Sequence, residues 1–436
     1  MVRLERFASG FTVEMAETFL PSAGIAQITR RHERSGSRRR DLPSELVAWL
    51  VICAGLWRHL ALPNVLALMR DSVAASMRWA RDGGQVPSSG AISRARSRLG
   101  VRPMRRILQY MVSRWWERRG EGHRWRGMAL VALDGTTLRM PESAENCAHF
   151  PLHHTGPGRV PASYPILRAV IAICATSRVV LACAAGKFTD SEWKLVRRVV
   201  RHLPERTLAL LDRGFMGLAF LRSLSDAGHE FVVRCKEGRK MQLVRSISPC
   251  DRIVRLPIGP RRKNQEWMTL RAVRCQRDGF RSMLVLTSLL DEEAFSAQDI
   301  AARYGDRWEC EAAFDEIKTH LLGRHVQFRS CSPLLVRQEL DGMLIAHNLI
   351  RMHMEEAARV GDLSPLRLSY TDCAARLRTA HIRMAQAPAR ALPEMMARLV
   401  ADLANRVLPA RKRRRYERVV KALPGRYPIR RRNRAA

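Results

Sequence analysis

The order of strands and helices between residues 127 and 236 constrains the fold of this chain most strongly. Short apolar runs that end in turn residues predict strands, and two stretches with helical periodicity predict helices. The predicted strands are GMALVALDG, the two halves of SYPILRAVIAICATSRVVLACAAGK, RTLALLDRGF and HEFVVRCK, and the predicted helices are 190–202 and 217–227. The order of three strands, a helix, a strand, a helix and a strand predicts an α/β fold built on one sheet.

This order matches the ribonuclease H-like layout, which the flanking regions extend. Alternating segments within 237–290, among them IVRLPI, EWMTLRAVRC and RSMLVLTSLL, predict a β-rich insertion. Apolar periodicity predicts helices within 11–118, over 295–322 with Gly305 as a candidate break, and over 334–359, 366–385 and 392–407. We therefore predict an α-helical N-terminal domain (1–118), a ribonuclease H-like core with an insertion at about 237–290 (119–345), and a helical, basic C-terminal region (346–436).

The charge of the chain points to a polyanionic partner. Lysine plus arginine number 76 against 41 aspartate plus glutamate, a formal net charge of +35. Since 46% of the residues are hydrophobic, the chain can bury real cores, and the charge excess does not indicate wholesale disorder. A globular chain with this excess attracts polyanions. The preference for arginine over lysine says less, because genomic base composition can produce it.

The sequence predicts neither a membrane span nor an export signal. The longest apolar stretches, Leu46–Trp57 and Ala169–Ser177, fall short of the ~20 residues that cross a bilayer. The N-terminus lacks an apolar core followed by a small-residue cleavage site. The 10 cysteines are scattered without a C-x-x-C pair, so they predict neither a zinc site nor a disulfide framework. We expect a cytoplasmic protein with reduced cysteines.

Two aspartates, Asp134 and Asp212, each follow an apolar predicted strand. In α/β sheets, side chains at the carboxyl ends of strands face the crevice that binds ligands. Two carboxylates placed close together repel each other unless a cation lies between them, and hard oxygen ligands of this kind suit Mg²⁺. Taken singly, each aspartate is explained better as a turn residue, because Asp-Gly and Asp-Arg-Gly are common turn sequences after a strand.

A third candidate element is the segment YGDRWECEAAFDEIK, residues 304–318. At about 100° per residue, one narrow helical face carries four groups that differ in kind: Tyr304, Arg307, Glu311 and Lys318. A helical face with these four groups is unlike the apolar face that a helix packs against a core. For this segment in isolation, a functional face and a solvent-exposed helix with surface salt bridges explain the pattern equally well. On the same arithmetic Glu309 and Glu316 point well away from this face, whereas Asp315 lies close to it.

The spacing Y-x-x-R-x-x-x-E-x-x-x-x-x-x-K, preceded by LVLTSLLD and by the strand-ending DGT and DRGF, resembles the DDE transposases of bacterial insertion sequences, specifically the insertion-element-four family. Residues 12–110 look like that family's N-terminal domain, and the arginine-rich end after residue 410 is similar to its C-terminal segment. The resemblance implies a catalytic domain of ribonuclease H-like fold and an N-terminal domain that binds DNA.

The resemblance also implies catalytic roles. Asp134, Asp212 and Glu311 would form the DDE triad, which is both the catalytic group and the metal-binding group. These three carboxylates would hold two Mg²⁺ ions, which Mn²⁺ could replace.

Four further residues would contact DNA by the same resemblance. Tyr304, Arg307 and Lys318 would bind phosphate beside the cleavage site. Some relatives stack a flipped base on a tryptophan of the insertion, and Trp267 is the nearest candidate. A buried strand tryptophan is the more frequent explanation for Trp267, because aromatic residues dominate cores.

The activity implied is that of a DNA transposase, which cleaves element ends and transfers the strands. Its partner would be double-stranded DNA, at the inverted repeats of the element and at the target, and it would act as a homodimer in the DNA complex. Basic segments at 30–40, 259–263 and 411–434 could contact the element ends, with binding that weakens steeply with salt. Two alternatives stay open: a Mg²⁺-dependent DNA nuclease of the same fold, and a catalytically inactive DNA-binding derivative.

Overall fold

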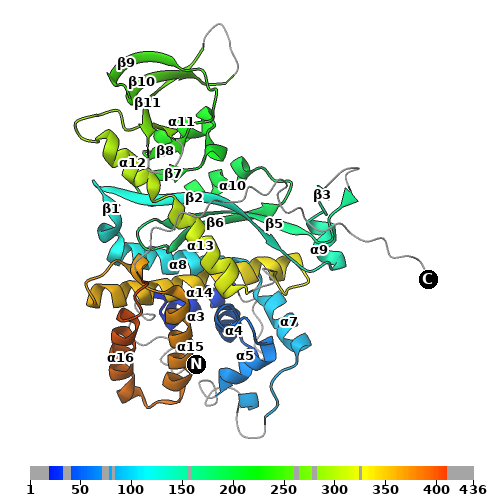
Figure 1. Ribbon diagram of the computed structural model, residues 1–436. Helices are drawn as coiled ribbons and strands as arrows, with labels where there is room; N and C mark the ends of the chain where they lie inside the picture. The colour runs from blue at the N-terminus through cyan, green and yellow to red at the C-terminus, as the bar shows by residue number, and fades with distance from the viewer. Residues whose placement is uncertain are drawn as a thin grey trace.

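The computed structural model of the chain describes residues 19–32, 41–70, 78–80, 84–155, 160–259, 265–276, 282–323 and 327–409. One mixed sheet crosses the molecule, and helices from both ends of the chain gather below it (Figure 1). The basic segments predicted at 30–40, 259–263 and 411–434 lie mostly or wholly outside the described residues. Within the described residues, every helix is too short or too polar to cross a membrane.

Five strands form the first part of the sheet: β2 (Met128–Arg139), β5 (Ile166–Cys174), β6 (Val180–Lys187), β7 (Thr207–Leu211) and β8 (Glu230–Arg234). Their order across the sheet is β6-β5-β2-β7-β8. β5 is antiparallel to β2 and β6, whereas β2, β7 and β8 run parallel. These strands are almost continuously buried, as expected for a sheet covered on both faces. The predicted ribonuclease H-like fold is therefore confirmed.

The β-rich insertion continues this sheet. β12 (Met283–Thr287) pairs with β8, and β11 (Trp267–Cys275), β10 (Asp251–Pro257) and β9 (Gln242–Ser248) follow in that order. β9 lies at the end of this order and is exposed along almost its whole length. Two-residue strands complete the described set: β1 (Arg124–Trp125), which pairs with β2, and β3 (His154–Thr155), which pairs with β4 (Val160–Pro161).

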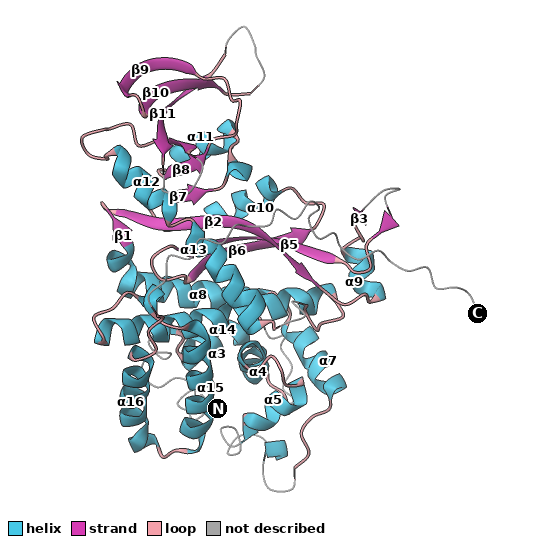
Figure 2. Ribbon diagram, viewed as in Figure 1, coloured by secondary structure: helices cyan, strands magenta, loops and turns pink. Residues whose placement is uncertain are grey.

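Helices cover both faces of the sheet. Figure 2 shows α10 (Glu192–Val200) above the strands β2 and β5, with α8 (Arg102–Arg119) and α14 (Pro333–Val360) below them. α11 (Leu218–Asp226) packs on β8. The other described α-helices outside the 297–321 segment are α3 (Ser22–Arg30), α4 (Ser44–Leu56), α5 (Leu62–Leu68), α7 (Ser89–Leu99), α9 (Ala144–His149), α15 (Tyr370–Gln386) and α16 (Leu392–Ala404). The helices predicted at both ends of the chain are confirmed in these residues.

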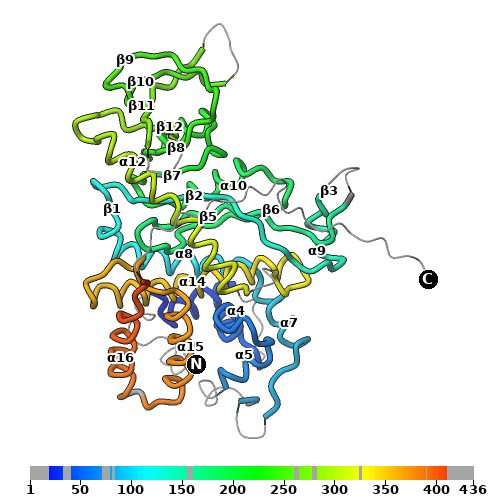
Figure 3. Tube along the Cα trace, viewed as in Figure 1, coloured from blue at the N-terminus to red at the C-terminus, as the bar shows by residue number. Residues whose placement is uncertain are grey.

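The N-terminal helices share a core with the C-terminal half of the chain. α4 is buried on all sides and lies beside α14 (Figure 3). A Cβ on Gly55 would lie 2.9 Å from the Cβ of Ala346, and a Cβ on Gly342 would lie 2.6 Å from Cγ1 of Val51. Glycine at these two positions therefore permits the close crossing of the two helices. The boundary predicted between residues 345 and 346 falls inside α14.

The predicted helix over 295–322 is divided into three parts. α12 (Ala297–Gly305) ends at the expected break, and α13 (Trp308–Asp315) runs into a π-helical segment, η5 (Glu316–Leu321). The π-helical segment was not predicted, and it changes the angular spacing of the side chains that follow it. α13 packs on β2, so the middle of this segment lies against the central strand.

Candidate active site

Asp134 and Asp212 lie side by side on two neighbouring strands, just past the last residues that pair β2 with β7. Asp212 follows the last residue of β7, as predicted, but β2 continues past Asp134 to Arg139, so the prediction that this strand ends at Asp134 is wrong. β2 and β7 are parallel and pair in register, with Leu133 opposite Leu211. Each aspartate is the next residue along its strand, and Asp212 opens the short 3₁₀ turn η4 (Arg213–Phe215). Because residues at the same level of neighbouring strands face the same side, both carboxylates emerge on one side of the sheet, from backbones about 4.8 Å apart.

A further carboxylate, Glu192, approaches the same two turns and was not predicted. Glu192 lies in the first turn of α10. A Cβ on Gly135 would lie 2.9 Å from its Oε1, and a Cβ on Gly214 would lie 3.8 Å from its Oε2. Gly135 therefore leaves room for this side chain, whereas a Cβ on Gly214 would make only an ordinary van der Waals contact. Gly135, in the Asp-Gly motif, was the signal in the sequence for this close approach.

Arg307 lies between Asp134 of β2 and Glu311 of α13 and contacts both carboxylates. Its Nη1 donates to Oδ2 of Asp134 at 3.4 Å, and its Nη2 donates to Oε1 of Glu311 at 3.0 Å. Arg307 is buried, whereas 44% of the Glu311 side chain is exposed. A guanidinium between two carboxylates is stabilised by both negative charges. Glu311 thus lies on the solvent side of the site and is linked to Asp134 by the Arg307 guanidinium, which contacts both carboxylates.

Burial raises the pKa of Asp134 to about 6, and its neighbours act in both directions. The backbone N–H of Gly135 donates to Oδ1 of Asp134 at 2.7 Å, and this hydrogen bond and the Arg307 charge lower the pKa. The negative charges of Asp212 and Glu311 raise it again. The net rise shows that the positive charge present does not fully offset burial and carboxylate repulsion.

Tyr304 and Lys318 flank the acidic group. The Tyr304 hydroxyl is buried and donates to the carbonyl oxygen of Leu211 at 3.4 Å, and burial raises its pKa to about 12. Burial lowers the pKa of Lys318, while the charge of Asp134 raises it. The six motif residues that the structure brings together are Asp134, Asp212, Tyr304, Arg307, Glu311 and Lys318.

The opposite side of the same segment holds a buried ion cluster. Arg178 Nε donates to Oε2 of Glu309 at 2.6 Å, and its Nη1 donates to Oε1 of Glu316 at 2.5 Å. Arg351 Nε donates to Oε2 of Glu316 at 2.8 Å. The prediction that Glu309 and Glu316 point away from the active face is therefore confirmed. The two arginines were missed, although an arginine within the apolar run of α14 signals a buried partner.

Two other side chains of the motif helix lie outside the acidic group. Asp315 is exposed and accepts a hydrogen bond from the Thr319 hydroxyl at 2.6 Å. Trp308 is 50% exposed, and its ring centroid lies 5.1 Å from the guanidinium carbon of Arg307. Trp308 is thus an exposed aromatic side chain next to a residue of the site.

Trp267 does not join this group. One row across the sheet joins Leu211, Val233, Leu286 and Ala272. β11 runs in the same direction as β7, and Trp267 precedes Ala272 by five positions in β11. Trp267 therefore lies toward the end of the strands opposite to the end near Asp134 and Asp212. Its side chain is 41% exposed, so the prediction of a buried strand tryptophan is wrong.

The carboxylates of the two neighbouring aspartates fit a divalent cation in kind. Asp134 and Asp212 offer hard oxygen ligands from a rigid sheet, and a cation there would offset the repulsion that raises the pKa of Asp134. Glu311 is turned toward Arg307. Within the described residues, no three Asp, Glu, His or Cys side chains lie close enough together to hold one ion. Ligation by all three carboxylates therefore requires side-chain rotation that separates Glu311 from Arg307.

Comparison with known proteins identifies the class that this fold and site define. The family description "Transposase DDE domain" matches residues 125–349, and "Insertion element 4 transposase N-terminal" matches residues 12–109. The chain is 31% identical over 402 residues to the transposase InsG for insertion sequence element IS4 of Escherichia coli strain K12, a match that covers 90% of this chain and 88% of that protein. A structure of the piggyBac transposase synaptic complex with hairpin DNA matches with a TM-score of 0.42 and 10% identity, over 91% of this chain and 84% of that chain.

These matches define a DDE transposase, with a catalytic domain preceded by a distinct N-terminal region. The chain belongs to the insertion-element-four family of these enzymes. The resemblance carried by the Tyr304 to Lys318 motif is therefore confirmed at the level of the family.

Proposed function

We propose that this transposase binds the ends of a DNA element and catalyses their metal-dependent cleavage and strand transfer through Asp134, Asp212 and Glu311. The observation that carries this proposal is the in-register pairing of β2 with β7, which brings the two aspartates side by side just past the last paired residues. Glu311 faces the same edge through the Arg307 that it shares with Asp134.

In the proposed reaction, a water oxygen first attacks the phosphodiester at the element end and releases a 3′-hydroxyl. That hydroxyl then attacks a phosphodiester of the target, so the broken bond is replaced by a new one without a covalent protein intermediate. Bound Mg²⁺, or Mn²⁺ in its place, would make the attacking oxygen more nucleophilic and stabilise the leaving 3′ oxygen. The three carboxylates would hold it, and Asp134 would give up its proton as it does so.

The neighbouring side chains would act on the DNA. Arg307, once released from Glu311 and Asp134, would donate to phosphate oxygens on which negative charge develops, and the Lys318 ammonium would offset the same charge. Tyr304 is buried against Leu211, so its contribution would be to hold the strand end that presents Asp212.

The test supplies pre-cleaved element ends and a circular target, with Mg²⁺ or Mn²⁺. We expect joined products, because only transesterification links the two DNAs. A plain nuclease of the same fold would only cut the circle, and an inactive DNA-binding derivative would bind the ends and leave the circle intact. Asp212→Asn should abolish joining, whereas the exposed Asp226→Asn at the end of α11 should not.

We also infer the division of labour along the chain. Residues 1–118 would bind the element ends, 119–345 would carry catalysis, and 346–436 would add a basic region against the DNA. The net charge of +35 supports duplex DNA as the partner. Joining requires two ends at once, so we expect a homodimer with two end duplexes by light scattering; one protomer per joined complex would contradict this.

A further inference from the structure

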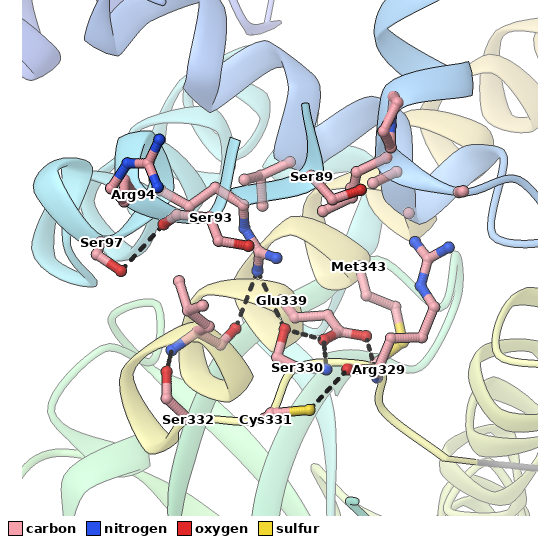
Figure 4. A pocket seen from close by; sticks show the side chains of 18 of the residues that line it. Ser89, Ser93, Arg94, Ser97, Arg329, Ser330, Cys331, Ser332, Glu339 and Met343 are labelled. Atoms are coloured by element: carbon pink, nitrogen blue, oxygen red, sulfur yellow. Dashed lines mark hydrogen bonds between the residues drawn. The ribbon is translucent and has the colours of Figure 1, made fainter. Parts of the chain in front are cut away.

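A cavity of about 840 Å³ opens between the N-terminal helices and the segment that leads into α14 (Figure 4). Residues of α4, α5 and α7 supply one wall, and residues 329–343 supply the other. Its charged lining consists of five arginines, Arg58, Arg94, Arg96, Arg98 and Arg329, and two glutamates, Glu145 and Glu339. We call this cavity the arginine pocket. Its charged side chains leave an excess of positive charge.

Glu339 is the inner carboxylate of the arginine pocket, and its acceptor positions are already occupied. Oε1 accepts from the Arg58 side chain and from the backbone N–H of Arg329 at 3.0 Å. Oε2 accepts from both the backbone N–H and the hydroxyl of Ser330. Glu339 therefore forms its ion pair with Arg58 and has no free oxygen for the other arginines.

The buried Arg96 and the exposed Arg329 both donate to neutral groups. Arg96 is buried, and its guanidinium donates to Oε1 of Gln338 at 2.9 Å, to the Ser330 hydroxyl at 3.2 Å and to a backbone carbonyl. Arg329 donates to two backbone carbonyls within residues 58–60. Partial burial of its guanidinium, followed by the charge of Arg58, lowers the pKa of Arg329 to about 10; the negative charge of Glu339 raises it and the charge of Arg96 lowers it further. These guanidinium groups lie together without enough negative charge, which an anion would correct.

The mouth of the arginine pocket offers donors that suit phosphate. Arg94 and Arg98 are exposed on α7, and the structure gives neither of them a salt bridge within the described residues. Ser89, Ser93 and Ser97 recur every four residues on the same helix and line the cavity (Figure 4). Guanidinium forks and hydroxyl groups are the side chains that most often contact the DNA backbone.

The arginine pocket is connected to the strand that carries Asp134. The backbone N–H of Phe328 donates to the carbonyl of Arg139 at 2.9 Å, at the end of β2. Asp134 lies five residues earlier in the same strand, a separation of roughly 17 Å along an extended chain. The same length spans about five nucleotides of one DNA strand. One DNA molecule can therefore contact both places.

We propose that the arginine pocket binds a backbone phosphate of the same DNA whose end lies at Asp134 and Asp212. This inference rests on the proposed function, because it takes DNA as the substrate. It adds a contact several nucleotides from the cleavage site, at the junction of α7 with the segment before α14. Such a contact would fix the register of the DNA end relative to the carboxylates.

The first test measures DNA binding without metal, so that cleavage cannot interfere. Arg94→Gln combined with Arg98→Gln removes two exposed charges at the mouth. The control, Arg201→Gln combined with Arg206→Gln, removes two exposed charges just before β7, at the end of that strand away from Asp212. We expect the pocket variant to bind an element-end duplex roughly tenfold more weakly near 0.15 M salt, with a salt slope lower by about 1 to 2, and the control variant to bind nearly as the wild type does. Equal weakening by both pairs would overturn the proposal.

The second test compares the wild type with the same pocket variant. Cys331 lines the arginine pocket and is exposed, and the other exposed cysteine, Cys250, lies in the insertion. DNA should slow alkylation of Cys331 by N-ethylmaleimide in the wild type, and this protection should be lost in the pocket variant, with Cys250 as the reference. If inorganic phosphate protects Cys331 and DNA does not, the pocket binds free anions and the proposal is wrong. DNA that protects Cys331 but is neither cut nor joined would overturn only the proposed function.

Discussion

The two faces of the segment formed by α13 and η5 carry the same kinds of charge in different surroundings. On the catalytic face, Arg307 contacts Asp134 and Glu311 at 3.4 and 3.0 Å, and 44% of the Glu311 side chain is exposed. On the anchoring face, Arg178 and Arg351 contact Glu316 at 2.5 and 2.8 Å, and only 5% of its side chain is exposed. The comparison separates buried ion pairs, which fix the position of the segment, from partly exposed ion pairs, whose members could exchange partners.

Burial decides which role an arginine–carboxylate pair can take. A buried pair that loses one member leaves an uncompensated charge, so it stays closed. A pair whose carboxylate is open to water, as Glu311 is, gains less from its contact and opens more readily, even though Arg307 itself is buried. The anchoring face therefore fixes the position of the backbone, whereas the proposed function requires the catalytic face to pass its carboxylates to a metal and its guanidinium to a phosphate. The predictions below test this division.

The largest effect is expected from Glu311→Gln. The substitution keeps the shape of the side chain and removes the negative charge that the proposed metal site needs. Cleavage of a labelled element end should fall by about 10³-fold or more, as for groups that act as one unit. The free energy of unfolding should change by less than about 1 kcal/mol, because the Arg307 pair is partly exposed. A cleaving Glu311→Gln enzyme would remove this residue from the triad.

Glu316→Gln should lower the free energy of unfolding far more than Glu311→Gln does. It leaves Arg178 and Arg351 without their shared carboxylate, and the free energy of unfolding should fall by about 3 to 5 kcal/mol in a urea titration. Glu309→Gln is the matched control, since its side chain is 24% exposed and contacts Arg178 alone. We expect it to cost about 1 kcal/mol and to leave cleavage intact. Equal costs for the two variants would show that burial does not distinguish them.

The sequence predicted the catalytic face better than the anchoring face. Asp134 and Asp212 could be placed on strands because apolar runs define strands locally, and parallel pairing brings the two residues together. The end of β2 was misplaced, since this strand continues past Asp134 to Arg139. The partner of Glu316 could not be placed, because Arg178 lies 138 residues away and its backbone adopts a left-handed conformation, with φ of 61°, in the turn between β5 and β6. A local sequence pattern does not show which buried charged residues contact each other in the fold.

Two further features depend on contacts that a linear pattern does not contain. The helical-wheel arithmetic assumed one regular helix, whereas η5 is π-helical over Glu316–Leu321. The prediction for Trp267 assumed that an aromatic residue in a strand is buried, but β11 extends beyond its pairing with β12 at this end and leaves the ring exposed. Both depend on how neighbouring elements pack.

Arg307→Gln should have an intermediate effect, because Arg307 acts on the catalytic face without being a carboxylate ligand. Loss of the cation should reduce cleavage by about 10- to 100-fold, the range found for residues that support a metal site. The Arg307 charge lowers the pKa of Asp134, so its removal should move the midpoint of the pH–rate profile upward. Arg303→Gln, one turn earlier in α12 and paired with Asp306, is the control. A midpoint that moves in neither variant would place Arg307 outside the site.

The metal-free protein should become less stable as pH rises from about 4 to 6. The pKa of Asp134 is about 6 in the folded protein against an ordinary value of 3.8, so the folded state binds the proton more tightly. Its stabilising contribution is complete below the ordinary value and is lost as pH rises through the folded value, by at most about 3 kcal/mol. Urea titrations of the wild type and Asp134→Asn should diverge over this window. Parallel curves would mean that Asp134 titrates normally.

The smallest effects should come from the two exposed tryptophans, and they should differ. Trp308→Ala removes the ring that lies against the Arg307 guanidinium, and a partly exposed contact of this kind contributes about 0.5 to 1 kcal/mol, so cleavage should fall about two- to fivefold. Trp267→Ala changes a side chain at the opposite edge of the sheet and should stay within about twofold of the wild type. Steady-state cleavage of a fluorescent end duplex resolves the two. A larger loss for Trp267 would show that the DNA path crosses the insertion, and the catalytic face would then extend well beyond α13.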